Sequence, residues 1–145
     1  MKRITYNITF LVVLSLFFIS CTLPDDDPVT CEEIFEELQQ QKIAIEDYAA
    51  TSICGEDYEC QFIGFGSKPC GGPWEYLIYT TSIDTEQLII MVNDYNELEN
   101  NYNELCGGAS DCSIPSQPIG FTCEDNQCIP IFLNFKNLVI YLFLY

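Results

Sequence analysis

The segment 84–108, DTEQLIIMVNDYNELENNYNELCGG, has the pattern of a long amphipathic helix. Asp84 can cap the first free amides while Gln87 reciprocates, and Gly107-Gly108 can end the helix because glycine accepts a left-handed conformation. The pattern predicts a helix of ~20 residues, or roughly 30 Å. Its apolar stripe consists of Leu88, Met91, Val92, Tyr95, Leu98, Tyr102 and Leu105.

A second helix of similar length is predicted to begin at Thr30, where Glu33 completes a capping-box pattern. It should end between Thr51 and Gly55. Two helices of matched length invite antiparallel packing, which would place Cys31 beside Cys106 and favour a disulfide between them. The apolar stripe of this first helix consists of Cys31, Ile34, Leu38, Ile45 and Tyr48.

Strand-like runs occupy the remainder of the segment 30–128. Residues 58–65 and 74–79 are rich in residues that favour strands, and the link 66–73 consists largely of residues that favour turns. Residues 113–118 read as an extended loop, and 120–123 with 127–129 read as a hairpin around 124–126. The predicted fold class is α+β: two helices packed on a small antiparallel sheet, stapled by disulfides.

The nine cysteines indicate an oxidising compartment. Cys21 stands apart, because it follows the N-terminal apolar run directly and is a candidate for lipid attachment. The other eight cysteines can pair completely. A metal site is disfavoured, because the chain has no C-x-x-C pair and no histidine, and no cofactor is expected. The cysteines predicted to form disulfides are Cys31, Cys54, Cys60, Cys70, Cys106, Cys112, Cys123 and Cys128.

The N-terminus has the features of an export signal. A cationic start, Met1-Lys2-Arg3, precedes an apolar run that ends at Phe18-Ile19-Ser20-Cys21. A small residue directly before a cysteine resembles the lipobox of bacterial lipoproteins. The resemblance implies that residues 1–20 are removed and that Cys21 carries fatty acyl chains, palmitate among them. An uncleaved membrane anchor is the alternative, but polar residues make the run shorter than the ~20 apolar residues needed.

Residues 21–29 then form an acidic, proline-bounded tether. The tether resembles the export tag of surface-displayed lipoproteins in some Gram-negative bacteria, and a solvated linker is the plainer interpretation. The expected location is the cell envelope, lipid-anchored at the outer membrane and open to surface display.

The strongly negative net charge of the chain limits the classes of partner that it can bind. The processed chain would keep three lysines, Lys42, Lys68 and Lys136, against 22 acidic residues, which gives a formal charge of −19. Such a chain repels phosphate backbones, so no nucleic-acid partner is expected. Membrane attachment is expected through the lipid anchor, and a protein or glycan ligand is the remaining partner class.

The tail 129–145 differs from the rest of the chain because Lys136 is its only charged residue. It is too short to span a bilayer as a helix. It can add a strand, contact lipid beside the anchor, or be a read-through tail outside the domain; the domain itself is predicted to end at Cys128.

Three motifs lie within residues 52–128: the run 66–74, GSKPCGGPW, the helical Tyr95-Asn96-Glu97-Leu98, and the closing pattern Asp111-Cys112, Pro118, Cys123 and Cys128. Together they resemble motifs of small cysteine-rich proteins that bacteria secrete. The resemblance covers residues 52–128. It implies a class and a compartment, and it carries over no catalytic residue.

The inventory of side chains argues against catalysis. There is no histidine to act as a general base and, after processing, no arginine to clamp an anion. We therefore expect a non-catalytic binding or structural lipoprotein. The alternative is a disulfide-rigid protease inhibitor that presents Lys68 on the loop 66–70, or else uses the loop 113–118. Candidate contact residues are Phe65, Lys68, Trp74, Tyr76 and Tyr79, and the four aromatic rings among them could instead belong to the core.

Overall fold

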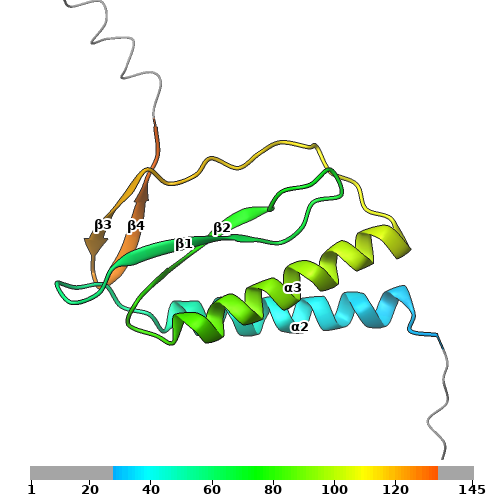
Figure 1. The fold of residues 1–145 in the computed structure, drawn as a ribbon, viewed down its shortest axis with the longest axis horizontal. Helices are drawn as coiled ribbons and strands as arrows, with labels where there is room; N and C mark the ends of the chain where they lie inside the picture. Colours follow the sequence, from blue (N-terminus) through cyan, green and yellow to red (C-terminus); the bar gives the residue numbers. More distant parts are fainter. Residues whose placement is uncertain (1–27, 134–145) are drawn as a thin grey trace, which may run out of the picture.

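The computed structural model describes residues 28–133 (Figure 1). Cys21, the predicted signal peptide and most of the apolar tail therefore lie outside the described residues. No helix within 28–133 combines the length and apolar character needed to cross a membrane. The elements are α2 (Cys31–Ala50), β1 (Cys60–Phe65), β2 (Glu75–Thr80), α3 (Thr85–Cys106), β3 (Gly120–Glu124) and β4 (Gln127–Ile131).

Both helices begin at the predicted caps. Thr30 Oγ1 accepts from the Glu33 amide at 3.3 Å, and the Glu33 carboxylate accepts from the Thr30 amide at 2.8 Å, which completes the capping box. The hydrogen bonds that the Thr30 amide and hydroxyl donate to the Glu33 carboxylate lower the pKa of Glu33. Asp84 accepts from the Gln87 amide at 3.0 Å, and Gly107 ends α3 with a φ of 78°. Local sequence therefore determines where each helix starts and stops.

The predicted bridge between the helices is present. Cys31 and Cys106 form a disulfide with a Cα–Cα distance of 5.8 Å, across a sequence separation of 75. Because the first residue of α2 is joined to the last residue of α3, the two helices run antiparallel, side by side (Figure 1).

The core lies between the helix pair and one face of the β1–β2 sheet. These strands pair antiparallel, from Cys60↔Thr80 to Phe65↔Glu75. Side chains alternate across a sheet, so Phe65 and Tyr79 point to the helices. Leu105, expected in the apolar stripe of α3, is instead 74% exposed. The buried core consists of Ile34, Leu38, Ile45, Ala49, Phe65, Tyr79, Leu88, Val92 and Tyr95.

The single sheet expected from the sequence is in fact two sheets of two strands. β3 and β4 form a separate hairpin, and the turn residues Asp125 and Asn126 both have positive φ. Two disulfides, Cys54–Cys123 and Cys60–Cys128, join this hairpin to the segment around β1. The two disulfides therefore hold the hairpin against β1, in place of the hydrogen bonds between strands that would hold it in one continuous sheet. The hairpin also continues to Ile131, three residues beyond the expected domain boundary at Cys128.

We expect the helix clasp to be an independent contribution to stability. Replacing Cys31 and Cys106 together with alanine should lower the free energy of unfolding by about 4 kcal/mol in the chain-entropy description. Thermal denaturation followed by circular dichroism measures the loss. Peptide mapping should find the other three bridges unchanged, and scrambling of those three would contradict the prediction.

Candidate functional site

A hollow of about 400 Å³ opens where the helix pair meets the turn between β1 and β2. Its floor is made by the buried rings of Phe65 and Tyr95, whose centroids are 4.8 Å apart. Its rim carries the chain's single tryptophan, Trp74, which is 39% exposed. The lining residues are Gln39, Lys42, Phe65, Gly66, Trp74, Glu75, Tyr95 and Glu99.

A row of polar side chains on α3 holds the backbone that forms one wall. Asn96 accepts from the Gly66 amide at 2.7 Å and donates to the Gly64 carbonyl at 3.1 Å. Glu99 accepts from the Ser67 amide at 2.5 Å, and Asn103 donates to the Ser67 carbonyl at 2.7 Å. Spacings of three and four place these side chains on one helix face. The row therefore fixes the end of β1 and the first residues of the following turn against α3.

Gly66 is required by this arrangement. Its φ is 82°, a left-handed conformation that disfavours other residues. A Cβ at this position would lie 2.5 Å from Cδ1 of Trp74 and 2.9 Å from a carboxylate oxygen of Glu99. The absence of a side chain thus lets Trp74 and Glu99 approach the same backbone segment.

Glu99 is a half-buried carboxyl group. Burial raises its pKa, opposed by hydrogen bonds from the Ser67 amide, the Trp74 indole and the Tyr95 hydroxyl and by the charge of Lys42. Burial and the nearby carboxylates, Glu99 first among them, raise the pKa of Tyr95. Tyr95 therefore stays protonated and available as a donor to Glu99.

Lys42 supplies the positive charge in the hollow. Its Nζ lies 3.1 Å from Glu75, 3.6 Å from Glu46 and 5.5 Å from the centroid of the Phe65 ring. Partial burial works to lower its pKa, but the hydrogen bond and charge of Glu75, with those of Glu46, outweigh it, and the pKa is raised. Lys42 therefore remains a cation paired with Glu75.

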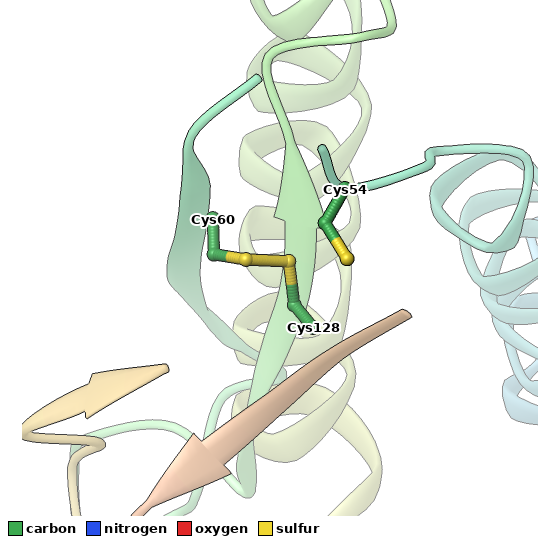
Figure 2. Close-up of side chains that lie close together, drawn as sticks. All are labelled: Cys54, Cys60 and Cys128. Atoms are coloured by element: carbon green, nitrogen blue, oxygen red, sulfur yellow. A yellow bond between two sulfur atoms is a disulfide. The ribbon is translucent and has the colours of Figure 1, made fainter. Parts of the chain in front are cut away.

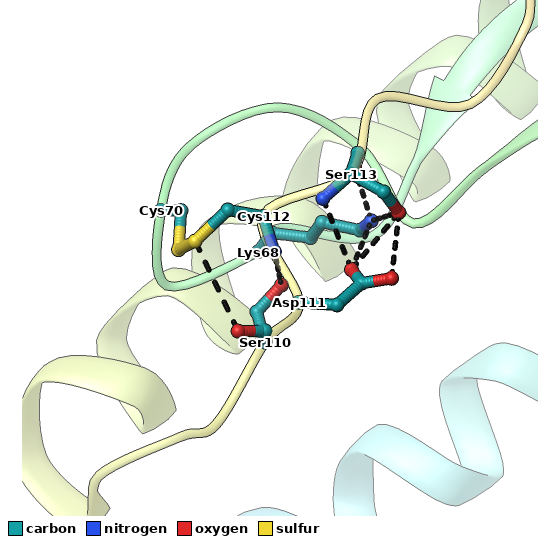
Figure 3. The surroundings of a disulfide bond; sticks show 6 residues. All are labelled: Lys68, Cys70, Ser110, Asp111, Cys112 and Ser113. Carbon is teal, nitrogen blue, oxygen red and sulfur yellow. Dashed lines mark hydrogen bonds and ion pairs between the residues drawn. A yellow bond between two sulfur atoms is a disulfide. The ribbon is translucent and has the colours of Figure 1, made fainter.

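Lys68 is buried and is not presented to solvent. Its side chain extends toward Asp111 and Ser113 (Figure 3). Its side chain is 5% exposed, and its Nζ donates to the Ser113 carbonyl at 2.5 Å and lies 3.4 Å from Asp111. It also lies 5.0 Å from the Trp74 ring centroid. The expectation that the loop 66–70 presents Lys68 to a protease is therefore wrong, since an ammonium group enclosed in this way serves as an internal donor.

The disulfide Cys70–Cys112 fastens the same two loops beside Lys68 (Figure 3). Asp111 in turn accepts from the amide and hydroxyl of Ser113, at 3.0 and 2.9 Å, and these hydrogen bonds lower its pKa. The loop around Lys68 is thus held by a covalent bridge, an ion pair and several hydrogen bonds.

The other candidate contact residues divide into core and surface. Phe65 and Tyr79 are 2% and 4% exposed, so they are core rings and not surface contacts. Tyr76 is half-buried, and its hydroxyl accepts from Gln117 at 2.9 Å. Of the five, only Trp74 lies on the rim of the hollow with an exposed ring. Sequence reasoning missed Gln39, Lys42, Glu75 and Glu99, because single polar residues on helix and strand surfaces carry no motif.

Comparisons with protein-family models, with curated proteins and with solved structures find no match to this chain.

The raised pKa of Glu99 predicts a pH dependence of stability. The folded state keeps the proton above the group's ordinary value of 4.5, so stability falls as pH rises from there through the raised pKa. Glu99→Gln should remove this loss. Urea unfolding of both proteins at a series of pH values measures it. The exposed Glu97→Gln on the same helix is the matched control, and a Glu99→Gln profile parallel to wild type would contradict the assignment.

Proposed function

We propose that this chain is a lipid-anchored protein of the cell envelope, and that its disulfide-rich domain is a non-catalytic binding module. The hollow beside Trp74 is its ligand site. The observation that carries the proposal is a preformed hollow of about 400 Å³ that combines an exposed indole with polar side chains from α2, β2 and α3. Such a concave site with a few convergent polar groups is typical of small-ligand binding.

The charges of the hollow favour a neutral ligand. Lys42 and Glu75 already pair at 3.1 Å, and Glu99 accepts from groups of the protein itself. An anion would meet the strong negative charge of the chain, and a cation would compete with Lys42 for its partners. A neutral polyhydroxylated ligand can use the outer sites of these groups without leaving a charge unpaired.

A carbohydrate is the ligand class we infer. Its hydroxyl groups match the amide of Gln39 and the carboxylate of Glu75, and its C–H faces can cover the exposed part of the Trp74 ring. A glycan of the envelope would be within reach of a protein anchored at Cys21. The carboxyl groups of the hollow are engaged in internal contacts, which supports binding in preference to hydrolysis.

Fluorescence of Trp74 gives a direct test, because it is the only tryptophan in the chain. Titration with a panel of neutral oligosaccharides should change its emission. Gln39→Ala and Glu75→Gln should each weaken binding by roughly tenfold, the effect of one lost hydrogen bond. Gln40→Ala is the matched control, since Gln40 is an exposed neighbour of Gln39 on α2 that does not line the hollow.

Equal affinity of the Gln39→Ala, Glu75→Gln and control proteins would move the ligand site away from the hollow. No emission change with any saccharide of the panel would remove the carbohydrate assignment.

Lipidation at Cys21 is tested separately. Metabolic labelling with a fatty-acid analogue should mark the wild-type protein and should not mark Cys21→Ala, because the thioether to the lipid cannot form without the thiol. Fractionation should place the wild type in the membrane fraction and the variant in the soluble fraction. Equal labelling of both proteins would contradict the anchor.

Protease inhibition stays the second candidate, now through the loop 113–118 alone. Ile114 in this loop is 84% exposed, and the Cys70–Cys112 disulfide fixes the loop at its start. A rigid, exposed apolar side chain of this kind suits insertion into a protease pocket. Titration against a panel of proteases decides it, since the absence of stoichiometric inhibition removes this class.

A further inference from the structure

Two disulfides lie side by side where the β3–β4 hairpin meets β1. Cys54–Cys123 and Cys60–Cys128 have Cα–Cα distances of 5.8 and 5.9 Å. The Sγ atoms of Cys54, Cys60 and Cys128 all lie within 4.8 Å of one another (Figure 2). A thiolate released from one bridge would therefore have the other bridge as its neighbour.

The backbone also brings together the partners of a second pairing. Cys123 and Cys128 are directly opposite in the hairpin register. Cβ atoms of such pairs are roughly 4.5–5.5 Å apart, close to the separation that a disulfide spans. Cys54 and Cys60 flank the bridge Gly55↔Tyr58, which folds the chain back on itself. Both alternative pairs, Cys54–Cys60 and Cys123–Cys128, thus join cysteines that already lie close together.

We propose that Cys54, Cys60, Cys123 and Cys128 form a thiol–disulfide exchange site, at which an attacking thiol converts the two bridges that hold the hairpin into two local bridges. The attacking thiolate first bonds to Sγ of Cys123, which is exposed, and the buried Cys54 leaves as a thiolate. Cys54 then attacks Sγ of Cys60 and releases Cys128.

Cys128 completes the sequence by attacking Sγ of Cys123 in the mixed disulfide. This step forms Cys123–Cys128 and releases the original thiol. Three S–S bonds form and three break, no electrons are gained or lost, and the attacking thiol is regenerated. The exchange therefore needs only a catalytic amount of a thiol.

The exchange changes how the hairpin is attached. The two native bridges are the disulfides that join β3–β4 to the rest of the described domain. After exchange, the hairpin would keep only weaker contacts, such as the Cys54 amide donating to the Asn126 carbonyl at 3.0 Å and the contact of Phe62 with Phe121. The site thus acts as a covalent switch on the position of the hairpin.

Disulfide mapping of the full chain tests the proposal. The oxidised protein is incubated without air in a substoichiometric amount of glutathione, quenched with acid, alkylated and digested. Peptides linked Cys54–Cys60 and Cys123–Cys128 should appear together in equal amounts, while Cys31–Cys106 and Cys70–Cys112 stay unchanged. Retention of Cys54–Cys123 and Cys60–Cys128, or a glutathione adduct on these cysteines with neither new linkage, would overturn the proposal.

Paired variants test the relay step. Removing one bridge with Cys54→Ser and Cys123→Ser should slow the opening of Cys60–Cys128 by glutathione roughly tenfold or more, since the neighbouring nucleophile is gone. Removing the remote bridge with Cys70→Ser and Cys112→Ser should leave that rate unchanged. An unchanged rate in the first variant would also overturn the proposal, and the wild-type map does not depend on either variant folding.

Discussion

Four long-range disulfides are the constraint on which this structure depends. The buried core is a small cluster of nine side chains, all from α2, α3 and the facing sides of β1 and β2. Burial of so few apolar side chains leaves little surplus over the conformational entropy of the chain. The bridges join cysteines separated by 42 to 75 positions, so each restricts the unfolded chain over a long loop. The disulfides also compensate for the low stability of the two-stranded sheets, since an isolated two-stranded sheet is only marginally stable.

Buried polar contacts organise the region that the core does not reach. At the end of β1, three polar side chains of α3 bind backbone groups, and beside Trp74 the ammonium group of Lys68 does the same for Ser113. Within residues 28–133, no buried polar side-chain atom lacks a hydrogen-bond partner. Satisfied networks of this kind specify one arrangement, because the loss of a single partner leaves a buried group unpaired. The wall of the hollow is therefore positioned by hydrogen bonds more than by apolar packing.

Sequence reasoning succeeded where the signal is local. Caps and 3.6-residue periodicity predicted both helices, and their matched lengths led to the Cys31–Cys106 bridge. It failed where the deciding contact is distant in sequence. Lys68 was expected on the surface because lysine usually is, and its partners lie more than forty positions away at Asp111 and Ser113. Glu99 and Asn103 likewise carry no motif, and their partner Ser67 lies on a distant segment. The split into two sheets follows from disulfides that eight cysteines alone do not identify.

The geometry of β1 separates the hollow from the cluster of cysteine sulfurs. Cys60, at the start of the strand, belongs to the sulfur cluster, whereas Phe65, at its end, forms the floor of the hollow. Strand residues advance ~3.3 Å each, so roughly 16 Å of backbone lies between them. The hollow is held by the polar row on α3, by Lys68 and by Cys70–Cys112, none of which involves the hairpin. Release of the hairpin at one end of β1 should therefore leave the hollow intact at the other end.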